Sequence, residues 1–182
     1  MKHIYIALSA LIFSLAAHAQ TYMQVGYTST NYSASALSSS GTAREVKASP
    51  AAARGILGYE VNPSFSIEGM LVLGLSDSNI SVSGISTPVN LKVDHLYGFY
   101  GKPKFQASPD LEVFARIGYA HSKGTMTYQS TNTSMSGNSL SYGVGMSYAI
   151  NKQMSVNIDA MTYYDKNSTR GTGTTVGIGY KF

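Results

Sequence analysis

The stretch Gly-Thr-Thr-Val-Gly-Ile-Gly-Tyr-Lys-Phe occupies residues 173–182 of the chain. Apolar and aromatic side chains dominate one parity of this stretch, while threonine, glycine and lysine occupy the other parity. Such an alternation is typical of a β-strand with one apolar face. Because successive side chains of a strand point to opposite sides, the stretch predicts a final strand whose apolar face carries Val176, Ile178, Tyr180 and Phe182.

Seven further stretches repeat this alternation. Together with 173–182 they predict eight strands, at residues 22–30, 51–60, 65–75, 89–102, 111–121, 140–150, 154–164 and 173–182. Three connections are short (61–64, 103–110 and 151–153), and four are longer and polar (31–50, 76–88, 122–139 and 165–172). Strands of about ten residues with alternating short turns and long loops are typical of outer-membrane barrels. The sequence therefore predicts an all-β fold, an eight-stranded antiparallel up-and-down transmembrane β-barrel whose first and last strands pair.

Composition agrees with a single membrane-embedded domain. The 182 residues include 12% charged residues, about half the usual share, together with 14 Tyr, 18 Gly and no Cys. The lack of cysteine excludes a disulfide scaffold and a thiolate metal site. The net charge of +4 is spread thinly, without a dense run of Lys or Arg, so no nucleic-acid partner is expected.

The first residues have the pattern of a secretory signal peptide. Lys2 and His3 precede an apolar stretch at 4–17, and Ala17-His18-Ala19 fits a cleavage site. The apolar stretch would span about 21 Å as a helix, too short for a hydrocarbon core of roughly 30 Å. We therefore expect a signal peptide at 1–19, export of the chain, and a barrel domain at 20–182, with an uncleaved membrane anchor as the less favoured alternative.

Charged residues within the expected strands all fall on the parity opposite to the apolar one. A lipid-facing Arg or Lys at the bilayer midplane costs about 2–4 kcal/mol, so this parity is expected to face the lumen. Six of these charges are expected near mid-height, three of each sign: Arg54, Glu68, Lys92, Asp94, Arg116 and Asp159. They are expected either to form a closed network of ion pairs or to remain partly hydrated.

Aromatic residues of the apolar parity gather near the two ends of the expected strands. Tyr59, Phe65, Phe99, Tyr148, Tyr180 and Phe182 lie toward the short turns, and Tyr119, Tyr142 and Tyr164 lie toward the long loops. Aromatic girdles at both membrane interfaces are typical of such barrels.

The chain resembles the small eight-stranded outer-membrane β-barrel proteins, the OmpA/OmpX-like or porin-like families with an outer membrane protein beta-barrel domain. The resemblance rests on the N-terminal segment, on residues 54–63 and 96–103, and on the last six residues. It implies location in the outer membrane of a Gram-negative bacterium, contact with outer-membrane lipid and lipopolysaccharide, and a monomeric state. It also implies that Val176, Ile178, Tyr180 and Phe182 form the assembly signal read by periplasmic chaperones and the barrel-assembly machinery.

The expected function is a structural role in the envelope, with a lumen filled mostly by side chains. An interior of eight strands is only wide enough for side chains, although the inward glycines leave a narrow porin-like water path as an alternative. A surface adhesin or ligand-binding barrel that acts through its long loops is a second alternative. In that region basic side chains, among them Lys123 and Lys166, are expected either to pair with lipopolysaccharide phosphates or to be merely solvated.

No enzymatic, metal or cofactor site is expected. His95 and His121 are the histidines that follow the signal segment. A lipid A-modifying enzyme is the least favoured alternative, because the neighbours His121 and Ser122 point to opposite faces of a strand and do not form a nucleophile–base pair. His95 is expected on the outward face, where the sequence offers no role for it.

Overall fold

The computed structural model describes residues 20–37, 43–129, 131–166 and 169–182, so the expected signal peptide at 1–19 lies outside the described residues. Within these ranges the chain forms ten β-strands: β1 (Thr21–Leu37), β2 (Ala43–Ala48), β3 (Ala51–Asn62), β4 (Phe65–Gly74), β5 (Asp77–Val82), β6 (Ile85–Ser108), β7 (Leu111–Tyr128), β8 (Thr131–Ala149), β9 (Met154–Lys166) and β10 (Thr169–Lys181). No helix among the described residues is long and apolar enough to cross a membrane.

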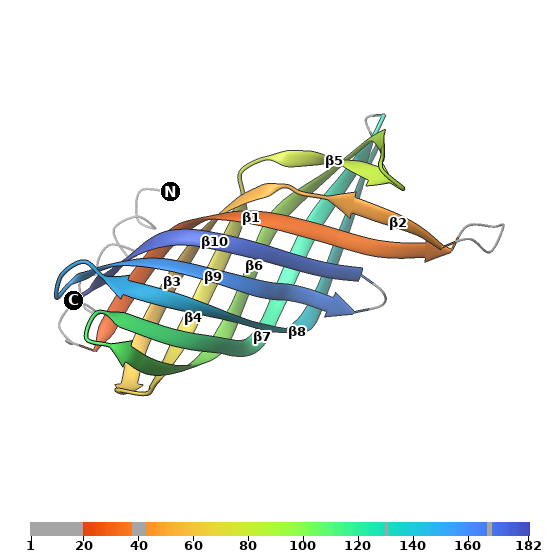
Figure 1. The fold of residues 1–182 in the computed structure, drawn as a ribbon. Coiled ribbons are helices and arrows are strands. Elements are labelled where there is room, and N and C mark those ends of the chain that lie inside the picture. Colours follow the sequence, from red (N-terminus) through yellow and green to blue (C-terminus); the bar gives the residue numbers. More distant parts are fainter. Residues whose placement is uncertain (1–19, 38–42, 130, 167–168) are drawn as a thin grey trace, which may run out of the picture.

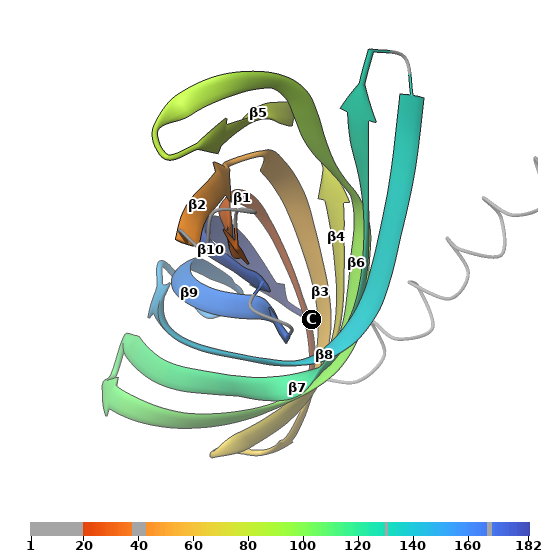
Figure 2. The ribbon, with the colours of Figure 1, turned by 90° about the vertical axis from the view of Figure 1, so that its right-hand side faces the viewer.

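Eight of these strands form a closed antiparallel ring. Their order around the ring is β1, β3, β4, β6, β7, β8, β9 and β10, and β10 returns to pair with β1. The closing ladder is long, from Tyr22 opposite Lys181 to Ala34 opposite Thr169. Figure 2 shows the ring nearly end on. The prediction of an eight-stranded up-and-down β-barrel is therefore confirmed.

The two ends of the barrel differ. At the short-turn end, residues 63–64, 109–110 and 150–153 connect neighbouring strands, and both Thr21 and Phe182 lie there. At the opposite end, which we call the long-hairpin end, several strands run well past the ring (Figure 1). Strands β2 and β5 lie at this end: β2 pairs with β1 and with β5, and β5 pairs in turn with β6.

Several strands extend further than the sequence predicted. The expected loops at 31–50 and 76–88 contain β2 and β5, and the expected loop at 122–139 is a continuous hairpin of β7 and β8. Strand β6 runs from Ile85 to Ser108, so the expected connection at 103–110 is reduced to a tight turn. Serine, threonine and asparagine interrupt the apolar alternation in most of these extensions, so the signal used to predict strands is weak there.

The alternation of side chains separates a lumen from a lipid-facing surface. Along β8, for example, Val144 is 63% exposed on the outside, whereas Ser141 on the opposite parity is fully buried. Phe99, expected in the girdle near the short turns, is 80% exposed. A bilayer requires an apolar surface all around the ring. It also requires that the ring be closed, because lipid offers no hydrogen bonds to strand edges.

A β-bulge in β6 reverses the expected parity of its first half. The ladder between β6 and β7 shifts by one residue between Val93 and His95. Leu91 and Val93, expected to face outward, are buried, whereas Lys92 is exposed. A bulge inserts one unpaired residue and so turns every side chain before it to the other face.

A second shift occurs where β9 pairs with β10, between Gly171 and Thr172. It changes the expected place of one girdle residue. Tyr164 lines a cavity at the long-hairpin end, and its hydroxyl lies 3.1 Å from the position that a Cβ would take at Gly137. The outer girdle prediction holds for the exposed Tyr119 and Tyr142 and is wrong for Tyr164.

The close approach of β10 to β1 requires glycine at position 177. A Cβ at Gly177 would lie 2.5 Å from the Val25 carbonyl oxygen and 3.0 Å from the Gly26 Cα, both backbone atoms of β1. We expect Gly177→Val to destabilise the folded barrel by about 3 kcal/mol, the upper end of overpacking costs. The folded fraction is measured by heat-modifiable migration after refolding in detergent, followed by urea titration. Thr174→Val, on the exposed face of the same strand, is the control and should fold normally; equal behaviour of the two variants would contradict the expectation.

Candidate functional site

Five charged side chains meet inside the barrel, and we call them the lumen charge cluster: Arg54, Glu68, Lys102, Arg116 and Asp159. Each is at most 5% exposed. They come from five different strands, β3, β4, β6, β7 and β9, and each occupies the inward parity of its strand. The cluster is therefore assembled across the ring by residues up to 105 positions apart in the sequence.

Arg116 is the centre of this cluster and is fully buried. Its Nε donates to Glu68 Oε2 at 2.5 Å, and its Nη1 donates to Asp159 Oδ2 at 2.8 Å. Asp159 also accepts from Arg54, whose Nη1 lies 2.7 Å from Oδ1 and whose Nη2 pairs with Oδ2. A planar guanidinium suits this role because it donates several hydrogen bonds in fixed directions.

Neutral groups complete the hydrogen bonding of the cluster. The Tyr22 hydroxyl donates to Glu68 Oε1 at 2.6 Å, and Gln24 Oε1 accepts from Arg116 Nη2 at 3.0 Å. The Tyr163 hydroxyl accepts from Arg54 Nη1 at 3.3 Å. Buried ions are tolerated only when their remaining donors and acceptors are satisfied in this way.

Lys102 connects the cluster to a sixth charge, on Glu112. Its Nζ lies 2.8 Å from Glu112 Oε1 and 4.0 Å from Glu68 Oε1. The ring of Phe114 lies under both cations, 4.4 Å from Lys102 Nζ and 4.4 Å from Arg116 Cζ. With Glu112 included, these six charges number three of each sign and balance one another.

Large side chains fill the lumen around these charges. The exposed fraction is only 2–3% for each of Met70, Tyr100, Phe114, Met161 and Tyr163, in agreement with the expectation of a side-chain-filled lumen. The inward glycines provide room for them: a Cβ at Gly118 would lie 2.6 Å from the Tyr100 ring, and one at Gly145 would lie 2.6 Å from the Phe114 ring. These glycines therefore accommodate aromatic rings from neighbouring strands.

Of the six charges expected at mid-height, the structure brings together Arg54, Glu68, Arg116 and Asp159 and leaves out the other two. Lys92 is exposed, and the carboxylate of Asp94 accepts from the Thr125 hydroxyl at 2.8 Å, away from the cluster. The bulge in β6 is the reason, because it removes both residues from the inward parity of the membrane-spanning half. Lys102, which was not among the six expected residues, takes their place on the inward parity of β6.

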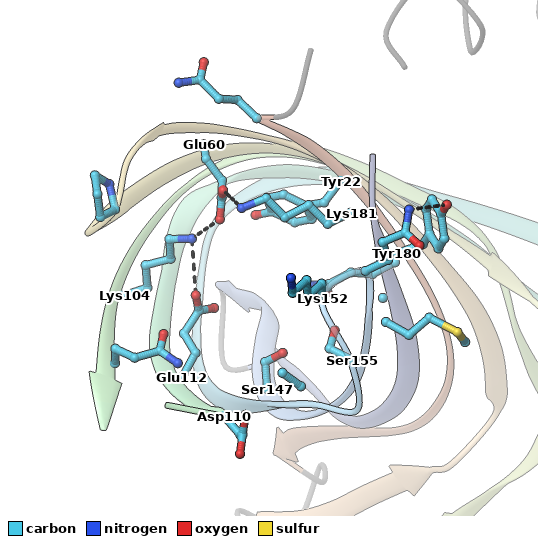
Figure 3. Close-up of a pocket in the computed structure, with 18 of the residues that line it drawn as sticks. Tyr22, Glu60, Lys104, Asp110, Glu112, Ser147, Lys152, Ser155, Tyr180 and Lys181 are labelled. Atoms are coloured by element: carbon cyan, nitrogen blue, oxygen red, sulfur yellow. Dashed lines mark hydrogen bonds and ion pairs between the residues drawn. The ribbon is translucent and has the colours of Figure 1, made fainter. Parts of the chain in front are cut away.

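Next to this cluster, a cavity of about 450 Å³ opens at the short-turn end (Figure 3). Lys104 bridges two carboxylates across its edge: it pairs with Glu60, and its Nζ lies 3.2 Å from Glu112 Oε2. Glu60 also pairs with Lys181 of the last strand. The sequence predicted Lys104 in a connection between strands and did not predict this chain of ion pairs. Recognition that β4 pairs with β6 up to Pro103 would have indicated that Lys104 lies close to the barrel.

The two described histidines lie together on the outer side of β6 and β7. Together with Tyr97 they form a three-ring cluster: the ring centroid of Tyr97 lies 6.1 Å from that of His95 and 5.1 Å from that of His121, and the two imidazole centroids lie 6.4 Å apart. His121 Nδ1 is 2.6 Å from Asn138 Oδ1, whereas the Ser122 hydroxyl is directed to the Gly137 carbonyl at 3.5 Å. His121 and Ser122 thus have separate partners. Among the described residues, no three His, Asp or Glu side chains are grouped so as to hold a metal ion.

The four residues expected to form an assembly signal lie along β10 and at its end. Val176, Ile178 and Tyr180 are 55%, 51% and 38% exposed on the outer surface. Phe182 contacts Tyr180 edge to face at 5.3 Å, and its backbone N–H donates to the Thr21 carbonyl at 3.0 Å. The pattern is thus displayed on the closing strand of the barrel.

Comparison with known proteins supports the architecture. Residues 5–182 match the family model described as "Outer membrane protein beta-barrel domain". A sequence comparison with curated proteins gives no match.

Solved structures of the same fold come from several bacteria. Neisserial surface protein A shares 14% identity with a TM-score of 0.65, covering 90% of this chain and 97% of that one. The attachment invasion locus protein Ail of Yersinia pestis shares 15% identity with a TM-score of 0.61, covering 89% and 97%. The N-terminal β-barrel domain of Pseudomonas aeruginosa OprF shares 13% identity with a TM-score of 0.59, covering 90% and 98%. At these identities the likeness is one of fold.

The central position of Arg116 leads to a stability prediction. Arg116→Leu leaves Glu68 and one side of Asp159 without their partner inside a closed lumen, and breaking such a buried pair costs about 3–5 kcal/mol. We expect a loss of this size in urea unfolding of the refolded protein in detergent. Lys92→Leu is the matched control: it removes an exposed charge on β6 and should change stability by less than about 0.5 kcal/mol. An Arg116 variant as stable as the Lys92 variant would show that the cluster does not stabilise the barrel.

Proposed function

Because the chain belongs to the outer membrane protein beta-barrel domain family and is an integral protein of the bacterial outer membrane, we propose that it acts as a structural barrel closed to solutes. The observation that carries this proposal is the lumen charge cluster. Arg116 reaches carboxylates from β4 and β9 across the ring, and the surrounding space holds Tyr100, Phe114 and Tyr163. An eight-stranded barrel has no further width for a water-filled channel.

The outer surface supports a role that depends on contact with lipid. The short turns of this family face the periplasm and the long hairpins face outward. We propose that the exposed apolar belt between the aromatic residues of the two ends lies against outer-membrane lipid and lipopolysaccharide, with the protein as a monomer. The exposed pattern Val176, Ile178, Tyr180 and Phe182 supports recognition of β10 by periplasmic chaperones and the barrel-assembly machinery.

The separate partners of His121 and Ser122 support a non-enzymatic function.

Conductance tests the closed lumen. We expect no stable openings of the wild-type protein in planar lipid bilayers. The double variant Glu68→Ala, Arg116→Ala removes one charge of each sign from the lumen charge cluster, so the net charge is unchanged while a gap opens, and we expect small channel events. Lys104→Ala, Glu60→Ala is the control, because it removes an ion pair at the wide short-turn mouth and should stay silent. Large, stable openings of the wild type would overturn the closed-barrel proposal.

A second candidate function is attachment to sulfated polysaccharides. Ail, which shares the fold, has been crystallised in complex with the heparin analogue sucrose octasulfate. In the present chain Lys92, Lys123 and Arg170 lie in the extensions at the long-hairpin end, where a soluble polyanion would meet the protein. Clustered cations on an outward surface favour such polyanions through long-range attraction.

Heparin affinity in salt gradients tests this second candidate. If the candidate holds, the detergent-solubilised protein elutes above physiological salt, and Lys92→Glu, Lys123→Glu lowers the eluting salt concentration at least twofold. Lys152→Glu, at the short-turn end, should leave elution unchanged. Elution of all three proteins at the same low salt would eliminate the attachment function.

A further inference from the structure

A second apolar core lies at the long-hairpin end, separate from the lumen charge cluster. Ala48, Ile80 and Leu91 are buried there, and Tyr32 and Met126 pack against them. The core exists because β2 and β5 fold over the opening and because the bulge in β6 turns Leu91 inward. Figure 2 views this end of the barrel, with β2 and β5 beside the tall β7–β8 hairpin.

Beside this core lies a cavity of about 250 Å³, which we call the outer cavity. Its wall is largely apolar and includes Leu91, Val93, Met126, Met135 and the ring of Tyr164. Apolar surface that remains uncovered next to water in a folded protein commonly marks a binding site. A volume of this size suits a single acyl chain and not a folded peptide.

The charged side chains that line the outer cavity are all of one sign. Four lysines line it, Lys47, Lys92, Lys123 and Lys166, and its described lining includes no Asp or Glu. Within the described part of the chain, Lys92, Lys123 and Lys166 have no carboxylate within ion-pairing distance. This contrasts with the short-turn mouth, where Glu60 and Glu112 neutralise the lysines.

Lys166 has the best position to reach a bound molecule. It follows Tyr164 by two residues on β9, so the two side chains share a face of the strand. The Tyr164 hydroxyl already lies at the cavity wall, 3.1 Å from where a Cβ of Gly137 would stand. An ammonium group at this edge can pair with an anion whose apolar part lies on Leu91 and Met126.

We propose that the outer cavity binds a medium-chain fatty acid as its carboxylate, with the acyl chain on the apolar wall and the head group at Lys166. The chain length follows from the volume, and the negative head follows from the uniform sign of the lining charges. The lumen charge cluster lies deeper in the barrel, and we place the bound ligand at the outer mouth alone. This binding does not depend on the closed-barrel proposal, which conductance tests separately.

The test is calorimetric titration of decanoate into the full-length folded protein in lipid nanodiscs, with empty nanodiscs as the blank. We expect saturable binding at one site beyond the blank. Lys166→Gln should weaken the affinity about tenfold, the loss of one charge-assisted contact, while Lys152→Gln at the short-turn end should leave it unchanged. Met126→Gln should weaken binding as well, because it places an amide on the apolar wall. Heat-modifiable migration verifies that each variant is folded.

Two further probes decide the chemistry of the head group. Decyltrimethylammonium, with the same chain and a cationic head, should bind at least tenfold more weakly than decanoate, and so should the neutral decyl maltoside. Equal or tighter binding of either probe would overturn the assignment of an anionic ligand. Binding of decanoate that does not exceed the empty nanodiscs, or that is unchanged in both Lys166→Gln and Met126→Gln, would overturn the site itself.

Discussion

Backbone hydrogen bonding in lipid is the constraint on which the rest of this structure depends. A bilayer core contains no water to pair with the edge of a sheet, so the last strand must return to the first. The β1–β10 ladder meets this requirement over 13 residue pairs, from Tyr22–Lys181 to Ala34–Thr169. Close approach along this ladder needs small residues, and Gly26 lies opposite Gly177 within it. Closure in turn creates an interior that the side chains of eight strands must fill.

The lumen contains more charged side chains than the hydrophobic core of a soluble protein would. Lipid excludes charged side chains from one parity of every strand, so Arg54, Glu68, Lys102, Arg116 and Asp159 all face the lumen. Once inside, each ion needs partners of the opposite sign, and the ring supplies them from strands on different sides. The cluster is therefore a consequence of the membrane environment outside the barrel as much as of the packing within it.

The long-hairpin end follows different rules because it leaves the membrane. There β2 and β5 add a second layer to the mouth, and apolar side chains such as Ile80 and Leu91 collect between the layers. A single bulged residue in β6 separates this region from the spanning part of the strand. Below the bulge the inward face carries Leu96, Tyr100 and Lys102, and above it the inward face becomes apolar. One irregularity thus divides a closed, charged lumen from an apolar outer cavity.

The sequence by itself determined the class of fold, the number of strands in the ring and the inward position of Arg54, Glu68, Arg116 and Asp159. All of these follow from a period-two alternation, which is local and which lipid on one side makes sharp. The tertiary structure decided the features that alternation does not specify, namely register shifts and the heights of inward residues. The inward turn of Leu91 and the outward turn of Lys92 depend on a register shift against β7, and the pairing of Lys102 with Glu112 depends on which inward residues reach the same height. In the hairpins at the long-hairpin end, apolar residues are scattered among serine, threonine and asparagine, so cross-strand hydrogen bonds and not a regular alternation identify them as strands.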